Sequence, residues 1–375
     1  MSENLRVLLA VQPSVSHYRA PFVRALLAQT EIDFELVGRV NHSASATADP
    51  VAASDAVLEH VQELRRVPVL RALYWDRGLV GAVCRTSARA IVIEGNVYGL
   101  SNWVAIAIAR IRRRRVVFWG HAWKRPESGV KLALRKFFYR CADAHLTYGN
   151  WAVAYAASVG LESNRFIPVY NSIYPGDVIA AQKVRDSRRT QSNTLRLMYS
   201  GRLTPRHCVD RLIVAVRALS AEGYGVHLDI VGDGPEATRL QELSNGSMCI
   251  TFHGAVYDPY KLQKLYGDVE FAVSPGASGL NVIQALGFGV PVVAAEGDPQ
   301  SGPELEAVRH RETGILYSAS QGVNGLKRAL VVASRTDSLT YRRLSENGIR
   351  VVKSRYSADI HARAVVAALV SMLDE

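Results

Sequence analysis

Long hydrophobic runs are missing from this sequence. No uninterrupted apolar stretch approaches the roughly 20 residues that a membrane-spanning helix needs, so we expect no spanning helix. The first residues, MSENLRVLLAV, also lack the basic region, long apolar core and cleavage site of a secretory signal. Their apolar residues are typical of a first strand. These absences predict a cytoplasmic protein.

Cysteine is sparse as well. The four cysteines, Cys84, Cys141, Cys208 and Cys249, are scattered along the chain without Cys-x-x-Cys spacing. The sequence therefore predicts neither a zinc site nor a disulfide framework, and we expect four reduced thiols.

Positive charge is confined to one half of the chain. Residues 1–190 contain 26 Lys and Arg against 15 Asp and Glu, whereas residues 191–375 contain 19 of each, so the first half carries the whole net charge of +11. This asymmetry indicates an acidic partner of the N-terminal half: anionic lipid, a phosphorylated acceptor or nucleic acid. We expect no nucleic acid, because no RNA- or DNA-binding motif and no aromatic stacking platform is present.

The composition and the order of elements indicate two α/β domains. Of the 375 residues, 48% are hydrophobic and 21% charged, as in a soluble globular protein, and two domains of roughly 150 to 200 residues are typical of this length. Two successive sets of alternating strand and helix patterns predict two Rossmann-like domains, residues 1–185 and 195–355. The polar segment from Lys183 to Thr194 has no apolar periodicity and is the predicted linker.

The stretch from Ala272 to Ala294 organises the second domain. It is predicted to form a buried strand, a Gly-rich turn at Ser274 to Gly279, a helix that ends at Gly287 and Gly289, and a second buried strand. Such a turn presents free backbone N–H groups and the positive end of the helix dipole. The alternatives are a phosphate site and glycines that serve packing alone.

The residue string of this stretch resembles the donor site of the retaining nucleotide-sugar glycosyltransferases of family 4, together with Pro303 to Ala307 and Thr313-Gly314 behind it. The resemblance covers residues 196–317 well and 5–175 more loosely. It implies the GT-B fold, in which two Rossmann-like domains face each other across a cleft. It also implies that the last helix, within residues 356–375, crosses back to the first domain.

Two positions depart from the family pattern. The family usually has two glutamates eight positions apart, the first near the transferred sugar and the second on the ribose hydroxyls. This chain has Gly276 and Gln284 there. Gln284 can still hydrogen-bond a diol, whereas Gly276 supplies no carboxylate, so another group must hold the sugar.

The resemblance also assigns the groups around the donor phosphates. Arg202 follows a predicted strand and matches the family's phosphate-binding arginine, whose planar guanidinium suits paired phosphate oxygens. The usual lysine five residues later is His207 here, and an ordinary imidazole titrates near pH 6.5. The helix start at Ser278, Gly279 and Leu280 completes this set.

The resemblance carries over to two further strand ends. It places the backbone of Val256 against the nucleotide base. It places His121, which follows the strand Val116–Trp119, beside the transferred sugar, where α/β sheets bind their ligands.

The first strand-to-helix turn departs from the family as well. Related enzymes often carry two glycines there under the donor phosphate, but Ser14 to Ser16 occupy this region. His17 and Arg19 could face the cleft. Alternatively, the segment is an ordinary loop with Tyr18 and Phe22 packed inward.

A basic patch is predicted in the N-terminal half. It comprises a run of four arginines and a basic helix with Leu and Phe among its charges; the named members are Arg112, Arg113, Arg114, Arg115, Lys131 and Arg135, with Lys124, Arg125, Lys136 and Arg140 beside them. Such a helix is typical of proteins that lie on an anionic membrane surface. The alternative is a solvated helix that packs its aromatic residues inward.

Together these features predict a hexosyltransferase-type enzyme. It would transfer a sugar from a nucleotide-diphosphate donor, with retention, to a lipid-linked saccharide or another amphiphile at the inner membrane face, and His121 and Arg202 are its predicted catalytic residues. No metal cofactor is expected, because no Asp-x-Asp motif stands at a plausible strand end. The alternative is a GT-B scaffold that binds a nucleotide sugar or a partner without turnover.

Overall fold

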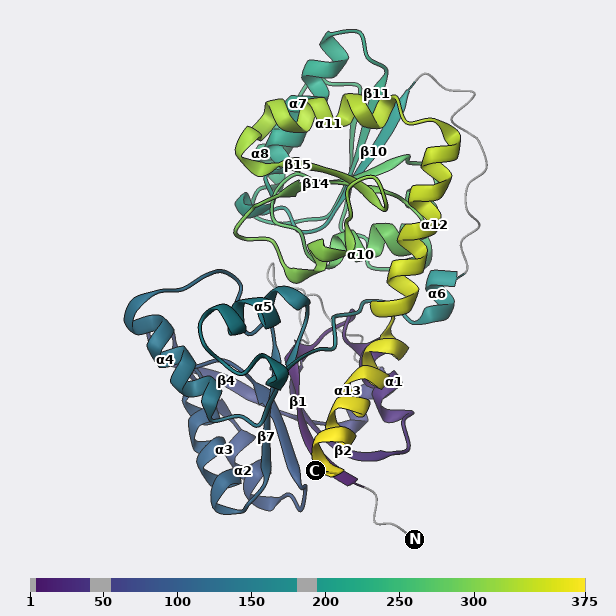
Figure 1. Ribbon diagram of the computed structural model, residues 1–375. Coiled ribbons are helices and arrows are strands. Elements are labelled where there is room, and N and C mark those ends of the chain that lie inside the picture. Colours follow the sequence, from purple (N-terminus) through teal and green to yellow (C-terminus); the bar gives the residue numbers. More distant parts are fainter. Residues whose placement is uncertain (1–4, 41–54, 181–193, 375) are drawn as a thin grey trace. The chain divides into compact units, whose positions relative to one another are not determined.

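The computed structural model describes residues 5–40, 55–180 and 194–374 (Figure 1). The contacts divide the chain into two compact units. Unit 1 comprises Met1–Ser172 and Ala358–Glu375, and unit 2 comprises Ile173–Ser357. The predicted linker, apart from Thr194, lies outside the described residues. Among the described residues, no helix has the length and hydropathy required to cross a membrane, and all four cysteines are free thiols.

Unit 1 is built on a parallel seven-stranded sheet with the order β3-β2-β1-β6-β7-β8-β9. Its strands are β1 (Leu5–Val15), β2 (Ile32–Val40), β3 (Val61–Glu63), β6 (Ala90–Glu94), β7 (Arg115–Gly120), β8 (Ala144–Thr147) and β9 (Phe166–Pro168). An antiparallel hairpin, β4 (Arg65–Leu70) and β5 (Leu73–Arg77), stands apart from it.

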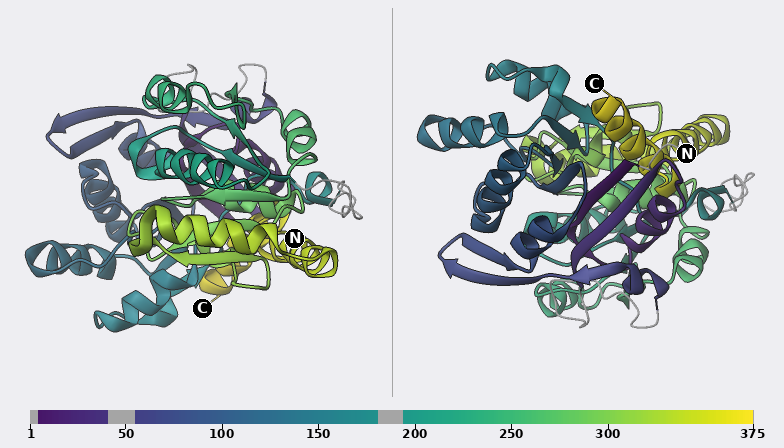
Figure 2. Two further views of the ribbon diagram at one scale, coloured as in Figure 1. Left: turned by 90° about the horizontal axis from the view of Figure 1, so that it is seen from above. Right: turned by 90° about the horizontal axis from the view of Figure 1, so that it is seen from below.

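Helices cover both faces of this sheet. They are α1 (Ala20–Leu27), α2 (Leu79–Arg85), α3 (Leu100–Ile111), α4 (Gly129–Arg140), α5 (Asn150–Ser158) and α13 (Ala358–Asp374). Successive residues of β1 point to opposite faces: Val7 and Leu9 belong to the core under α1 and α13, whereas Leu8 belongs to the core under α2 and α3. In the right-hand view of Figure 2, purple β1 lies between yellow α13 and the blue helices. The C-terminal helix therefore completes the core of unit 1.

Unit 2 repeats this architecture with six parallel strands in the order β12-β11-β10-β13-β14-β15. Its strands are β10 (Leu195–Ser200), β11 (Val226–Val231), β12 (Ile250–Gly254), β13 (Phe271–Ser274), β14 (Val292–Glu296) and β15 (Gly314–Ser318). Its helices are α6 (Gly176–Ala180), α7 (Val209–Ala221), α8 (Ala237–Ser244), α9 (Pro259–Tyr266), α10 (Leu280–Gly287), α11 (Gly322–Ser334) and α12 (Ser338–Arg355). The expected α/β class with two Rossmann-like units is confirmed.

The strand order of unit 2 fixes where a ligand can bind. The chain runs outward from β10 to β12 and then returns to place β13 on the other side of β10. The connections therefore diverge between β10 and β13, and open parallel sheets bind ligands at the carboxyl ends of the strands at such a switch point.

Candidate active site

The predicted strand-turn-helix-strand unit is present in unit 2. β13 ends at Ser274, α10 begins at Leu280 after Gly279 as its N-cap, and β14 follows. Arg202 stands two residues past the end of β10 and is half-buried. Because β10 and β13 are adjacent parallel strands, Arg202 and the start of α10 lie at the same edge of the sheet.

The turn before α10 is held by its own side chains. Ser278 Oγ donates to Ser274 Oγ at 3.0 Å, and Asn281 Nδ2 donates to the same oxygen at 3.2 Å. The N–H of Ser278 donates to Ser301 Oγ, and that of Gly279 donates to Asn281 Oδ1. These two donors therefore already have protein acceptors, which leaves the first-turn N–H groups of Leu280 and Asn281 for a ligand. Sequence reasoning missed Asn281, although an Asn just inside a helix start is a recognisable turn signal.

Gly276 is a site of close backbone approach. A Cβ on Gly276 would lie 2.6 Å from the carbonyl oxygen of Arg206 and 2.8 Å from the carbonyl carbon of His207. The next residue, Ala277, donates its N–H to the Arg206 oxygen at 3.0 Å. The backbone of the loop after β10 thus occupies the space that any side chain at position 276 would need.

Gln284 lies inside unit 2 with its amide in use. Its Oε1 accepts from Ser200 Oγ at 2.9 Å and from Tyr266 Oη at 3.2 Å, while its Nε2 donates to Tyr174 Oη at 2.8 Å. The side chain is buried. A ribose diol would therefore have to displace one of these partners, and the ribose role of Gln284 stays a prediction.

His207 departs from the assumption of an ordinary imidazole. Burial, together with the nearby guanidinium groups of Arg206 and Arg202, lowers its pKa to about 4. Its Nδ1 lies 2.8 Å from Thr204 Oγ1, and the ring also hydrogen-bonds the backbone of Arg202. The titration near pH 6.5 expected from sequence is thus corrected: His207 is neutral at pH 7. Its contact with phosphate stays a prediction.

Val256 follows β12, the edge strand of the sheet, and is half-buried. It stands at the same carboxyl edge as Arg202, on the far side of β11. The proposed contact of its backbone with a nucleotide base stays a prediction.

His121 belongs to unit 1 and lies in a sharp turn. Gly120 before it has φ +146°, in a region that favours glycine, and Ala122 after it has φ +55°. The half-buried His121 ring stands edge-on to Tyr148, with centroids 4.9 Å apart. The turn therefore holds the imidazole at the carboxyl end of β7. Its role at the sugar stays a prediction.

The first strand-to-helix turn of unit 1 is largely buried, and Arg19 is enclosed within it. Ser14, Ser16, Arg19 and Phe22 are all buried. Nη1 of Arg19 donates to Asn171 Oδ1, and its guanidinium carbon lies 5.2 Å from the ring centroid of Trp119. Phe22 packs inward as in the ordinary-loop interpretation, but sequence gave no sign of the aromatic surroundings of Arg19.

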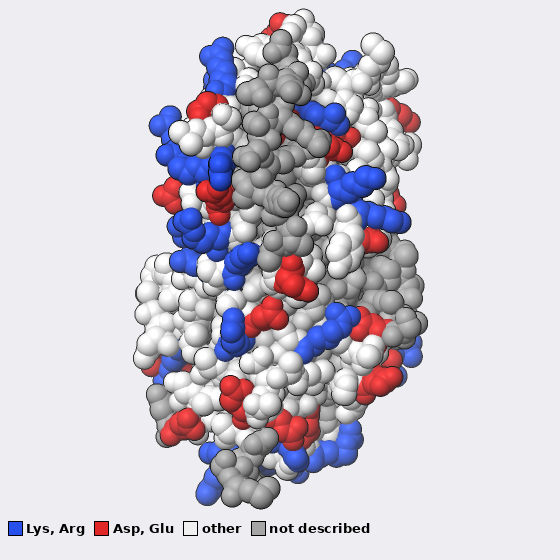
Figure 3. All heavy atoms as spheres, turned by 90° about the vertical axis from the view of Figure 1, so that its right-hand side faces the viewer, with Lys and Arg blue, Asp and Glu red and all other residues white. Residues whose placement is uncertain are grey.

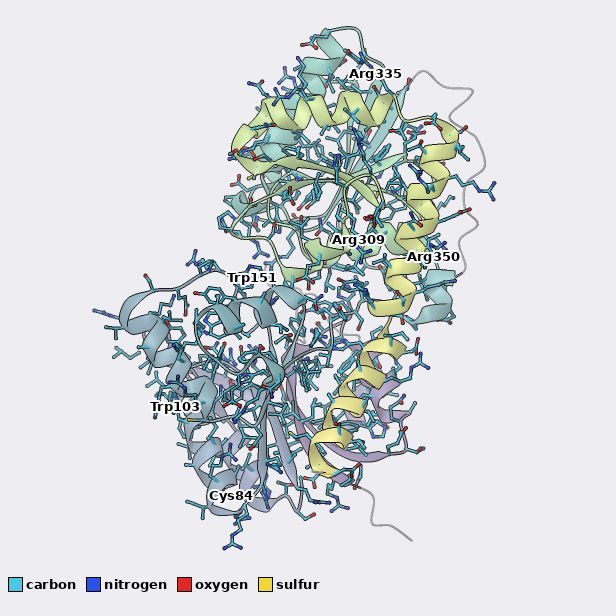
Figure 4. The ribbon with its side chains drawn as sticks, viewed as in Figure 1. Cys84, Trp103, Trp151, Arg309, Arg335 and Arg350 are labelled. Carbon is cyan, nitrogen blue, oxygen red and sulfur yellow. The ribbon has the colours of Figure 1, made fainter. Side chains whose placement is uncertain are left out.

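The arginine run has a structural role that the sequence did not reveal. Arg114 donates to the carbonyl oxygens of Val83 and Thr86, and Arg112 donates to that of Cys84. These carbonyls belong to the C-terminal end of α2, where the last turn leaves acceptors unpaired. Figure 4 labels Cys84 at this end of the sheet. Arg115 begins β7, whereas α4 follows the carboxyl end of β7. The arginine run and the start of α4 therefore lie at opposite edges of the sheet.

Arg135 is corrected from a surface residue to an internal partner. Its side chain is 12% exposed, and its Nε and Nη2 donate to the two carboxylate oxygens of Glu127 at 2.7 and 3.0 Å. Burial raises the pKa of Glu127, but Arg135 and Lys131 outweigh this effect and lower it. Lys131 remains half exposed, 3.1 Å from Glu127. Arg135 is therefore unavailable to a lipid surface.

The exposed side of α4 is apolar as well as basic. Val130, Leu134 and Phe137 fall at helical spacing and are 85%, 46% and 59% exposed. Phe137 stacks on Trp103 of α3, which Figure 4 labels, with centroids 6.0 Å apart. Figure 3 shows a different face, where Lys and Arg alternate with Asp and Glu.

Comparison with known proteins agrees with this architecture. Residues 194–335 match the family model for glycosyl transferases group 1. A GDP-mannose-dependent alpha-(1-6)-phosphatidylinositol dimannoside mannosyltransferase of Mycobacterium tuberculosis is 32% identical over 116 residues, 30% of each chain. The protein CapJ of Staphylococcus aureus is 28% identical over 97 residues, 24% of this chain and 25% of that protein. The matched region thus spans less than a third of the length of these curated relatives.

Solved structures match nearly the whole chain at low identity. Anabaena HepE in complex with UDP and glucose has a TM-score of 0.67 and 17% identity, covering 98% of this chain and 100% of that one. Sucrose-phosphate synthase of Thermosynechococcus elongatus has a TM-score of 0.68 and 18% identity, with 99% of both chains covered. The lipopolysaccharide outer core galactosyltransferase WaaB has a TM-score of 0.68 and 14% identity, covering 98% of this chain and 99% of that one.

The fold and the switch-point site define a protein of the GT-B class. Its second unit matches the group 1 glycosyltransferases over residues 194–335, in agreement with the resemblance to family 4 seen in its sequence.

Proposed function

We propose that this chain transfers a sugar, with retention, from a nucleotide-diphosphate donor to an amphiphilic acceptor. The observation that carries the proposal is the position of Arg202 and the start of α10 at one edge of two adjacent strands. A guanidinium and free helix N–H groups are what a diphosphate requires.

The chemistry proposed for this site is stabilisation of the leaving group. Negative charge develops on the diphosphate as the bond to the sugar breaks, and fixed donors aimed at that charge lower the barrier. Arg202 and the N–H groups of Leu280 and Asn281 would supply these donors. His121 is the proposed residue at the transferred sugar, as the family resemblance implies.

The names of similar proteins suggest the donors to test. HepE was crystallised with UDP and with UDP-glucose, and the mycobacterial relative is named for GDP-mannose. We therefore propose a uridine or guanosine diphosphate sugar as the donor of this chain.

The acceptor is proposed to be lipid-linked, at an anionic membrane surface. The relative named above acts on a phosphatidylinositol dimannoside by its name. In this chain, the α4 surface (Val130, Leu134 and Phe137 with Lys124, Arg125, Lys131 and Arg140) combines exposed apolar and basic side chains. Apolar side chains that insert among lipids and cations that face anionic headgroups are typical of interfacial helices.

A donor-binding experiment tests the core of the proposal. UDP, GDP and their sugars should raise the melting temperature, because a ligand at 100 times its dissociation constant adds about 2.7 kcal/mol of stability. Arg202→Ala should weaken nucleoside-diphosphate binding by about 1.5–3 kcal/mol. Arg196→Ala, at the other end of β10, removes the same charge and should leave binding unchanged. Equal affinity of both variants by calorimetry would refute the phosphate role of Arg202.

Turnover separates the enzyme from the rival scaffold that binds without reaction. That rival is favoured by Gly276, which supplies no carboxylate. Transfer from a radiolabelled donor in the presence of membranes would eliminate it. His121→Ala should then lower turnover more than donor affinity, and wild-type turnover of this variant would leave His121 with a structural role.

A further inference from the structure

Unit 2 contains a pocket of about 800 Å³ at the carboxyl edge of its sheet. The loops after β10, β14 and β15 form it, and its lining includes Arg206, Cys208, Arg211, Asp298 and Ser320. None of the residues assigned to the donor lines it. This volume is within the range of small-molecule sites, roughly 300–1,000 Å³.

The approach at Gly276 fixes the backbone of Arg206. The Arg206 carbonyl is held by the Ala277 N–H, and Cys208 adopts φ +52°, a left-handed conformation that is uncommon outside glycine. Between them, His207 turns its ring to Thr204 and the backbone of Arg202. The cation of this loop that lines the pocket is therefore Arg206.

The pocket has an excess of positive charge. Neither Arg206 nor Arg211 forms an ion pair within the described parts of the chain. Asp210, which precedes Arg211 in the first turn of α7, lies 3.6 Å from Arg239 instead, and Asp298 is the one acidic residue in the pocket lining. Arg211 lies in the first turn of α7, where the helix dipole disfavours a cation. Two guanidinium groups and the positive end of a 13-residue helix thus face one open pocket that contains a single carboxylate, a combination that favours an anion.

We propose that this pocket is a second anion site, at which Arg206 and Arg211 bind the phosphate or carboxylate group of a small molecule. Anion binding in this pocket does not rest on the proposed transferase function, because the lining is separate from Arg202 and α10; only the assignment of the anion to the donor sugar does. The anionic group belongs either to the sugar of the donor or to a separate molecule. Arginine is suited to both groups through paired N–H···O bonds.

The experiment measures pyrophosphate binding to the full chain by calorimetry. Arg206→Gln and Arg211→Gln should each weaken binding by about tenfold to a hundredfold, as expected for loss of a charge-assisted hydrogen bond. Arg343→Gln, an exposed arginine of α12, is the matched control for lost charge and should bind as the wild type does. Pyrophosphate also fits the proposed donor site, so each variant is measured in the Arg202→Ala background as well, in which the pocket's affinity should be retained. Binding that is equally tight in all four variants, or absent from the wild type at millimolar pyrophosphate, overturns the proposal.

Cys208 provides a second readout that loss of folding would not mimic. Its thiol lines the pocket, so bound anion should slow its alkylation by iodoacetamide through occlusion and through disfavouring the thiolate. Peptide mass spectrometry follows Cys208 beside Cys141 of unit 1, which should be unaffected. An unchanged Cys208 rate at saturating pyrophosphate overturns the assignment.

Competition identifies the source of the anion. If a nucleotide hexuronate or nucleotide sugar phosphate needs Arg206 for tight binding, and the matching neutral nucleotide sugar does not, the group belongs to the donor. If UDP-saturated protein still binds pyrophosphate through Arg206, the ligand is a separate molecule.

Discussion

Nη1 of Arg19 lies 3.0 Å from Oδ1 of Asn171, which ties the start of α1 to the end of the first segment of unit 1. Nη2 of Arg19 approaches the Tyr148 hydroxyl at 3.4 Å, and the rings of Tyr18, Phe22, Trp119 and Tyr148 surround the guanidinium. The side chain is 1% exposed and has no ion pair with any described carboxylate. The charge is therefore held by hydrogen bonds and ring faces alone.

Substitution of Arg19 tests whether its charge or its shape matters. Arg19→Lys should lower the free energy of unfolding by about 1–3 kcal/mol, because an ammonium cannot reproduce the fork that contacts Asn171. Arg19→Met should stay within about 1 kcal/mol of the wild type, because it removes a buried charge and keeps the length. All five tryptophans belong to unit 1, so tryptophan fluorescence in urea follows this unit. If Arg19→Met greatly lowered the free energy of unfolding and Arg19→Lys did not, the charge itself would be required.

Unit 1 should lose stability in mild acid. Burial lowers the pKa of His145 to about 3, and burial together with the Arg19 charge lowers that of His361 well below its usual value. The unfolded chain binds these protons near pH 6.5 and the folded chain does not, so stability is full above pH 6.5 and falls as the pH drops. Well below pH 6.5, the slope should approach about 2.7 kcal/mol per pH unit for the two groups.

Single variants assign this acid sensitivity. His145→Gln and His361→Gln should each remove about half of the slope of unfolding free energy against pH. A slope that neither variant changes would mean that other groups cause acid unfolding.

Donor affinity should be independent of pH between 6.5 and 8. An ordinary imidazole, which titrates near pH 6.5, would lose its charge across this range, but the pKa of His207 is about 4 in the free protein, so its ring is neutral throughout. Bound diphosphate favours the protonated ring and raises that pKa, so affinity should increase only at lower pH. His207→Lys should bind UDP or GDP about tenfold tighter at pH 7.5, because it restores a cation. A wild-type decline between pH 6.5 and 8 that this variant abolishes would contradict the inward ring.

Substitutions of the two central arginines of the run, Arg113 and Arg114, should change the free energy of unfolding by different amounts. Arg114→Ala should cost about 2 kcal/mol, because Arg114 binds the carbonyls of Val83 and Thr86 at the end of α2. Arg113 is exposed with φ +55°, so Arg113→Gly should be neutral or stabilising by up to about 1 kcal/mol. Urea unfolding followed by tryptophan fluorescence measures both. Equal losses would mean that charge alone, and not the carbonyl contacts, sets the stability.

Membrane binding should depend on the α4 surface. The protein should sediment with vesicles that contain anionic lipid, and the sedimented fraction should fall as the salt concentration rises. Salt screens the attraction between the basic side chains and the headgroups, with a screening length of about 10 Å at 0.1 M. Leu134→Ser with Phe137→Ser, or Lys131→Gln with Arg125→Gln, should weaken sedimentation, whereas Arg113→Gln, at the other edge of the sheet, is the control. If the α4 variants sediment as the wild type does, α4 is only a solvated helix.

Local sequence patterns predicted the elements of the donor unit. Alternating strand and helix periodicity predicted the unit from β13 to β14, together with the Gly-rich turn at Ser274 to Gly279 and the helix-ending Gly287 and Gly289. Turn formation and the spacing of buried residues depend on near neighbours in the sequence, so a local pattern is enough to predict them. The same patterns predicted two Rossmann-like domains and the strand end that carries Arg202, whereas the GT-B fold was implied by the resemblance to family 4.

Tertiary structure decided what the side chains at those elements do. Gly276 is glycine because the backbone of Arg206, 70 positions earlier in the sequence, takes the space of its Cβ. Gln284 is held by Ser200, and Arg135 is held by Glu127. Burial and two neighbouring arginines make His207 neutral. These outcomes depend on which strands become neighbours and how much water each group loses, and both are set by long-range packing that no local pattern encodes.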